Sequence, residues 1–172
     1  ATLVAAAIHW RRPRALAQLS LLVSLTVLVM AGAGAALEPD SAAGALTLGL
    51  VPVALGVVWV VLAARWRLRP PRVGLVSGGL VATLLPLTGA TEPARGAVLG
   101  VVVALSIALM AAALARPPLT LLMVPGGLGL LVGLPLLIEL VVDEAVATWA
   151  GVLVAGMMLT AAAVWMLRRA DR

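Results

Sequence analysis

The stretch RWRLRPPR, residues 65–72, decides how this chain folds, because it places four arginines between two long apolar runs. The whole chain has only twelve basic residues, and 63% of its residues are hydrophobic. Charge that gathers where apolar runs end is typical of turns between membrane-spanning helices. We therefore interpret residues 65–72 as a turn that connects two membrane spans.

The composition indicates the same class of protein. Only 11% of residues are charged, against roughly a quarter in soluble domains, and the mean hydropathy is +1.18. A chain of 172 residues cannot enclose that much apolar surface in a core of its own. The pI of about 11.7 does not indicate nucleic-acid binding, because the arginines stand at the ends of apolar runs and not on a polar face.

Six uncharged runs have the length of a membrane span, since roughly 20 helical residues cross about 30 Å of hydrocarbon. They cover approximately residues 15–37, 45–64, 73–90, 96–115, 119–138 and 145–167. The runs are continuously apolar, which favours helices over alternating strands. We predict an all-α, polytopic transmembrane helical bundle of six spans, forming a single transmembrane domain over residues 1–172.

The charged segments between the runs alternate in sign. With six crossings, every arginine except Arg95 falls on one side of the membrane, and six of the seven acids fall on the other. The positive-inside rule places the arginine side, and with it both termini, in the cytoplasm. The four guanidiniums of residues 65–72 leave a second interpretation open, a site for a phosphate or a lipid headgroup.

Tryptophan positions agree with these boundaries. Trp10, Trp66 and Trp165 adjoin the arginine-rich segments and Trp149 adjoins the opposite boundary, as expected of an interfacial belt, whereas Trp59 lies deeper as a packing residue. The chain contains no Lys, Asn, Phe or Tyr, whose codons are AT-rich. We therefore expect a GC-rich bacterial genome and the bacterial cytoplasmic (plasma) membrane.

Several turns put arginine before proline, which suits the start of a following helix. These turns are WRRPR (10–14), WRLRPPR (66–72) and ARPP (115–118), and the segments VSGGLVATLLPL (76–87) and VPGGLGLLVGLPL (124–136) also resemble each other. A two-helix hairpin repeat is one organisation that explains this, and chance similarity in a chain of few residue types is the other. Residues 1–10 read as the end of a preceding helix or as a short amphipathic leader.

Residues for catalysis are sparse. His9 is the only histidine and stands at the predicted membrane edge, there is no cysteine, and the serines have no candidate base at membrane depth. No hydrolase, metalloprotease or phosphate-loop motif is present. We expect no enzyme activity, no cofactor and no metal site.

The fifth span offers the one candidate membrane site. Helix-weakening residues follow one another there, and Glu139 lies about one turn beyond the last of them; the candidate residues are Pro125, Gly129, Gly133, Pro135 and Glu139. Interrupted helices of this kind form substrate sites in some transporters, and a carboxylate inside the membrane is usually functional. The alternatives are that the glycines serve close helix packing and that Glu139 lies in headgroup water.

Small residues also recur at a spacing of four in two other spans, and we expect both stripes to pack closely. The stripes are Gly74, Gly78 and Ala82 in the third span, and Gly96, Gly100, Ala104, Ala108 and Ala112 in the fourth.

Three functions fit this architecture. The scarcity of polar groups at membrane depth favours a non-catalytic transmembrane component of a transporter or larger membrane complex. Its expected partners are the lipid bilayer and other membrane subunits or further copies of the chain. A permease for an apolar substrate, such as a lipid or hydrophobic drug, and a membrane sensor module are the alternatives.

The tail AVWMLRRADR, residues 163–172, is similar to the ending of the permease half of bacterial ATP-driven exporters, which also has six spans with both ends cytoplasmic. The resemblance implies a partner ATPase and no functional residue. The chain departs from that family in being short and in having no long cytoplasmic coupling segment.

Overall fold

The computed structural model describes residues 15–37, 41–65, 67–89, 91–140, 142 and 144–170. Within these residues all regular structure is helical and no strand is present, which confirms the all-α prediction. The elements are α2 (Ala15–Ala36), α3 (Ala42–Ala64), α4 (Pro71–Thr83), α5 (Leu85–Gly89), α6 (Arg95–Ala115), the 3₁₀ helix η1 (Pro117–Leu122), α7 (Met123–Glu139) and α8 (Glu144–Ala170). The predictions for residues 1–14, including His9, Trp10 and the end of a preceding helix, and for Trp66 lie outside the described residues.

Five helical segments are long and apolar enough to cross a membrane. They are Ala15–Ala36, Ala42–Ala64, Pro71–Thr88, Arg95–Ala115 and Pro117–Glu139. The chain is therefore a membrane-embedded, multi-pass helical protein. The sixth predicted span falls on α8, whose described apolar stretch, Trp149–Ala162, is shorter than a span, so the count of six stays a prediction.

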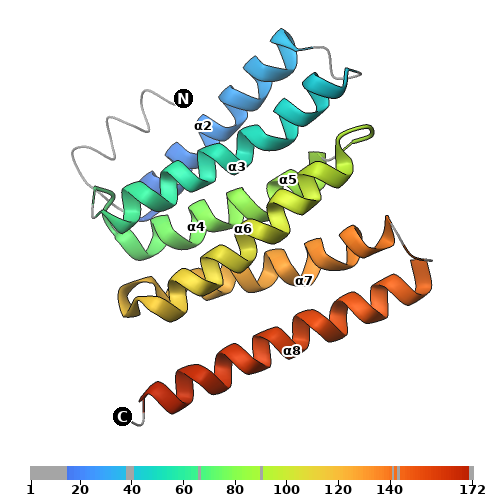
Figure 1. The fold of residues 1–172 in the computed structure, drawn as a ribbon. Coiled ribbons are helices and arrows are strands. Elements are labelled where there is room, and N and C mark those ends of the chain that lie inside the picture. Colours follow the sequence, from blue (N-terminus) through green and yellow to red (C-terminus); the bar gives the residue numbers. More distant parts are fainter. Residues whose placement is uncertain are drawn as a thin grey trace.

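The helices run back and forth, and their connections gather at two ends of the bundle (Figure 1). The α3–α4 and α6–η1 connections, which carry Arg67, Arg69 and Arg116, lie at one end. The α5–α6 connection, with Glu92, and the end of α7 at Glu139 lie at the other. The charge separation expected from the sequence is thus present in space, while the end that faces the cytoplasm stays a prediction.

Helices α3 and α4 pack backbone to backbone. A Cβ added to Gly56 would lie 2.5 Å from the carbonyl oxygen of Gly78 and 2.6 Å from the Cβ of Ala82. A Cβ on Gly78 would lie 3.0 Å from the Gly56 oxygen. Only small residues permit this approach, and in lipid such close contact supplies much of the attraction between helices. The predicted packing role of the third-span stripe is confirmed.

The middle of the fourth-span stripe, from Gly100 to Ala108, is turned away from the described helices, so the expectation that the whole stripe packs closely is wrong for the chain by itself. Ala104 and Ala108 are exposed, and a Cβ on Gly100 would have nothing within 4 Å. Helix α6 buries its opposite face instead, through Val98, Leu99, Val102, Val103, Ser106, Leu109, Met110 and Ala113. A spacing of four identifies one face of a helix and does not identify what that face meets.

The third span, expected to be continuous over 73–90, is interrupted at Leu84. Pro86 has no N–H to donate to the Ala82 carbonyl, and the Leu87 N–H donates to the Leu84 carbonyl at 3.1 Å instead of continuing the α pattern. Helix α4 therefore ends at Thr83, and the short helix α5 follows. Thr83 and Pro86, on either side of the break, are fully buried, which suits irregular backbone at membrane depth.

The fifth span was expected to be an interrupted helix, but α7 runs without interruption from Met123 to Glu139. Pro125 is its third residue, where the backbone N–H has no partner within the helix and its loss costs no hydrogen bond. Pro135 lies inside the helix. The glycines between the two prolines are tolerated because neighbouring helices pack against them.

Candidate functional site

Pro125 and Gly129, two residues of the predicted site, lie where α4, α6 and α7 meet. The Thr83 hydroxyl at the end of α4 donates to the Gly79 carbonyl at 2.9 Å and lies 3.2 Å from the Pro125 carbonyl. On α6 the Ser106 hydroxyl donates to the Val102 carbonyl at 2.7 Å. Both Thr83 and Ser106 are fully buried, so the junction is polar yet enclosed.

Gly129 is the residue that lets this junction close. A Cβ there would collide with the Ser106 hydroxyl oxygen and would lie 2.7 Å from the Thr83 Cβ. The two hydroxyls already have carbonyl acceptors within the chain, which removes the cost of burying them. At Gly129 not even a methyl group has room between these two side chains. The junction therefore joins three helices and has the chemistry of a packing contact.

Gly133 and Pro135 continue the same role along α7. A Cβ on Gly133 would lie 3.4 Å from a methyl group of Val103 on α6. Pro135 faces the other neighbour, since a Cβ on Gly151 of α8 would lie 2.6 Å from the Pro135 Cα. The proline ring thus takes the place of a side chain that Gly151 lacks.

Glu139 stands apart from the other four predicted residues and has a partner of its own. Its carboxylate lies 4.0 Å from the guanidinium of Arg95, and the two side chains are 34% and 36% exposed. Arg95 is the one arginine that the sequence places on the acidic side of the membrane. The structure brings the two together across the antiparallel pair α6 and α7, which the sequence did not predict.

The two charges of this pair also interact with the dipoles of α6 and α7. Arg95 is the first residue of α6 and Glu139 is the last residue of α7, so each charge stands at the unfavourable end of its own helix. Because the helices are antiparallel, each charge lies at the favourable end of the neighbouring helix. The half-buried carboxylate of Glu139 is thus paired with Arg95 at the edge of the bundle.

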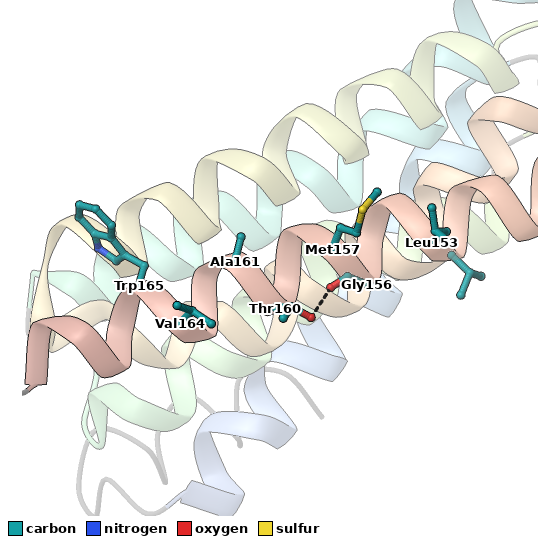
Figure 2. Close-up of a pocket in the computed structure, with 8 residues that line it drawn as sticks. Leu153, Gly156, Met157, Thr160, Ala161, Val164 and Trp165 are labelled. Carbon is teal, nitrogen blue, oxygen red and sulfur yellow. Dashed lines mark hydrogen bonds between the residues drawn. The ribbon is translucent and has the colours of Figure 1, made fainter.

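The outward face of α8 forms an open apolar groove (Figure 2). The groove has a volume of about 700 Å³ and includes Leu153, Gly156, Met157, Thr160 and Trp165. Thr160 donates to the Gly156 carbonyl at 2.8 Å, and a Cβ on Gly156 would have nothing within 4 Å. Among the described helices, α8 packs mainly on α7 (Figure 1), so this face has no partner in the part of the chain that the structure describes.

Two further apolar grooves lie between helices. One, of about 380 Å³, runs between α6 and α8 and includes Met110, Leu114 and Met158. The other, of about 430 Å³, lies between α2 and the α4–α5 break and includes Val27 and Leu84. Both open toward the surface of the bundle and neither contains a charged side chain.

Sequence reasoning gave too little weight to Gln18. This side chain is fully buried, and its amide donates to the Pro70 carbonyl and accepts from the Gly74 N–H, both at 3.1 Å. The Gly74 N–H otherwise has only a long contact, 3.5 Å, with the Pro70 carbonyl, so Gln18 links α2 to the first turn of α4. A lone glutamine in a long apolar run was the available signal, because a polar group at membrane depth needs a partner.

Within the described residues no group of three or more His, Cys, Asp or Glu side chains could hold a metal ion. Trp59 belongs to the main hydrophobic cluster, with Leu22 and Leu109 among its members, in agreement with a packing role. No protein-family model matches the chain, and neither a curated protein nor a solved structure is significantly similar to it.

Proposed function

We propose that the chain is a non-catalytic transmembrane component of a transporter or of a larger membrane complex. The observation that carries this proposal is that the buried polar side chains are hydrogen-bonded to the backbone. Gln18, Thr26, Thr83 and Ser106 are all buried, and each bonds backbone groups of the chain itself. A solute pathway needs polar groups directed into a cavity. Here Gln18 and Thr83 bond the backbone of a second helix, and Thr26 and Ser106 bond their own helix.

The open face of α8 supports association with another membrane protein. Gly156 and Thr160 are one helical turn apart, and small residues at this spacing allow a second helix to approach closely. Tryptophans bound the same face, with Trp149 78% and Trp165 59% exposed. We infer that a helix of another subunit, or of a second copy, packs here.

The runner-up function is a permease for an apolar substrate. The grooves beside α8 and beside the α4–α5 break favour it, because they are apolar and large enough for part of a lipid chain. The two functions differ in what the isolated chain can do. A permease moves its substrate in a reconstituted membrane, with or without a partner ATPase, and a structural subunit does not.

The test compares Gly156→Trp with Gly34→Trp. Both positions are open, since a Cβ on either has nothing within 4 Å, so both variants should fold. After mild solubilisation of the native membrane, the affinity-tagged chain should retain stoichiometric partner subunits or a second copy. We expect Gly156→Trp to lower this recovery about tenfold, which corresponds to roughly 1.4 kcal/mol, and Gly34→Trp to leave it unchanged.

Two results would contradict the proposal. A chain that stays monomeric, with no stoichiometric companion and no difference between the two variants, has no partner on α8. Movement of a fluorescent lipid or hydrophobic dye by the purified chain in liposomes, above the level of empty liposomes, would replace the subunit assignment with the permease.

A further inference from the structure

At the arginine-rich end of the bundle, two turns that are distant in sequence enclose one cavity. The cavity lies between the α3–α4 turn and the α6–η1 turn and has a volume of about 720 Å³. Its walls include Arg72 with Pro71 from the first turn, and Arg116 with Pro117 from the second. This volume is within the range of roughly 300–1,000 Å³ that is common for small-molecule sites.

The two arginines are available to a ligand. Both side chains are exposed, and within the described residues neither guanidinium has a hydrogen-bond or ion-pair partner. The described carboxylates of Glu92 and Glu139 belong to the opposite end of the bundle (Figure 1). Two unpaired guanidiniums around one cavity create a local positive potential that favours an anion.

The role of arginine in orienting the chain across the membrane does not explain why Arg72 and Arg116 line the same cavity. A topology signal requires only that arginines lie in the turn, wherever their side chains point. Of the described arginines at this end, Arg65, Arg67 and Arg69 do not line the cavity, whereas Arg72 and Arg116 do. Arginines from separate turns share one cavity, which indicates a recognition role for this pair.

The remaining walls favour a lipid over a free anion. Below the arginines the cavity is lined by Ala63, Leu75 and Leu119, which belong to or adjoin the apolar spans. A phosphodiester at the arginine level would place its acyl chains along this apolar wall. Guanidinium groups suit phosphate oxygens because their donors match the oxygen geometry in a bidentate manner.

We propose that the cavity between the two arginine–proline turns binds the phosphate headgroup of an anionic phospholipid, held by Arg72 and Arg116. Basic pockets between transmembrane helices bind anionic headgroups in this way. The site is independent of the subunit function proposed above, because the cavity and the α8 groove have no lining residue in common.

The experiment measures binding of dioctanoyl phosphatidylglycerol to the full chain in a neutral detergent by native mass spectrometry. Dioctanoyl phosphatidylcholine, which has the same chains and a zwitterionic headgroup, and inorganic phosphate are the comparison ligands. The variants are Arg72→Gln with Arg116→Gln and, as a control of equal charge, Arg67→Gln with Arg69→Gln. Circular dichroism and gel filtration confirm that each variant is folded.

We expect the unmodified chain to prefer phosphatidylglycerol, and the Arg72/Arg116 variant to lose about tenfold in its affinity, the effect of roughly one charge-assisted interaction. The Arg67/Arg69 variant should stay within about twofold, because these two exposed side chains do not line the cavity and solvent screens their charge. If the double variant does not fold, the same binding measurement is made with the single variants Arg72→Gln and Arg116→Gln.

Three results would overturn the proposal. Equal binding of phosphatidylcholine would show that the headgroup charge is not recognised. Equal losses in the two double variants would show general attraction to a basic surface. Binding of inorganic phosphate as tightly as the lipid, through Arg72 and Arg116, would assign the site to a free anion.

Discussion

Two stripes of small residues have the same spacing, but one is buried between helices and the other is open to the surface. On α4, Gly74, Gly78 and Ala82 are buried, and Gly78 meets the backbone of α3 at Gly56. On α6, Gly100 and Ala104 form a similar stripe, but Ala104 is exposed and a Cβ on Gly100 would meet no described residue within 4 Å. The pattern is shared, and the difference comes from the neighbours. A small-residue stripe therefore predicts that close packing is permitted and does not predict that it occurs.

The largest effect should follow from filling the buried stripe's contact. In Gly56→Leu the added side chain would have to enter a space where even a Cβ lies 2.5 Å from backbone atoms of α4. We expect a loss of about 3 kcal/mol or more in the free energy of unfolding, because neither backbone can move without separating the helices. Unfolding in mixed micelles, followed by circular dichroism, measures it. A change below about 1 kcal/mol would mean that α3 and α4 are not in direct contact.

A smaller effect should come from Gln18, which holds the first member of the buried stripe. Gln18→Leu removes the acceptor of the Gly74 N–H and the donor to the Pro70 carbonyl. The Gly74 N–H and the Pro70 carbonyl would keep only their 3.5 Å contact with each other, and the loss of two hydrogen bonds should cost about 1–3 kcal/mol. Thr47→Val is the control, because Thr47 is exposed and its hydroxyl bonds only its own helix. Equal stability of the two variants would contradict the tethering of α2 to α4.

The ion pair at the end of the exposed stripe should contribute less. Arg95 adjoins Gly96, where an added Cβ would lie 3.4 Å from Cδ1 of Leu140, the residue that follows α7. A double-mutant cycle of Arg95→Gln and Glu139→Gln should give a coupling of about 0.5 kcal/mol, reduced by salt, since both groups are partly exposed. A large coupling that salt does not change would instead indicate a pair buried in lipid and would restore Glu139 as a functional candidate.

The smallest effect should come from the exposed stripe itself. Gly100→Leu combined with Ala104→Leu adds bulk where there is open space, so the stability of the isolated chain should change by less than about 0.5 kcal/mol. The measurement is the same unfolding experiment used for Gly56→Leu. If the double variant unfolds as readily as Gly56→Leu, α6 packs through the stripe and the present arrangement of α6 is wrong.

The candidate site was only partly predictable. Pro125, Gly129, Gly133 and Pro135 were identified as unusual, because prolines and glycines in an apolar helix need a reason. Their reason, contact with α4, α6 and α8, depends on which helices are neighbours, and periodicity along one helix does not contain that information. The break itself occurs at Leu84 in the third span, where Pro86 was the signal. The role of Glu139 stays a prediction, and its contact with Arg95 could not be predicted because the two residues are far apart in sequence.

The sequence by itself determined the all-helical class, the apolar helical segments and the charged segments that end them. These follow from the length of apolar runs and from the cost of placing charge in lipid, which are local properties of the chain. Only the tertiary structure decided which glycines are buried, where α4 is interrupted, and which arginines share a cavity. Each of these depends on the rotation of a helix about its axis and on the identity of its neighbours. In a bilayer nearly every helix face is apolar, so hydrophobicity does not select the inward face, and close packing between particular residues does.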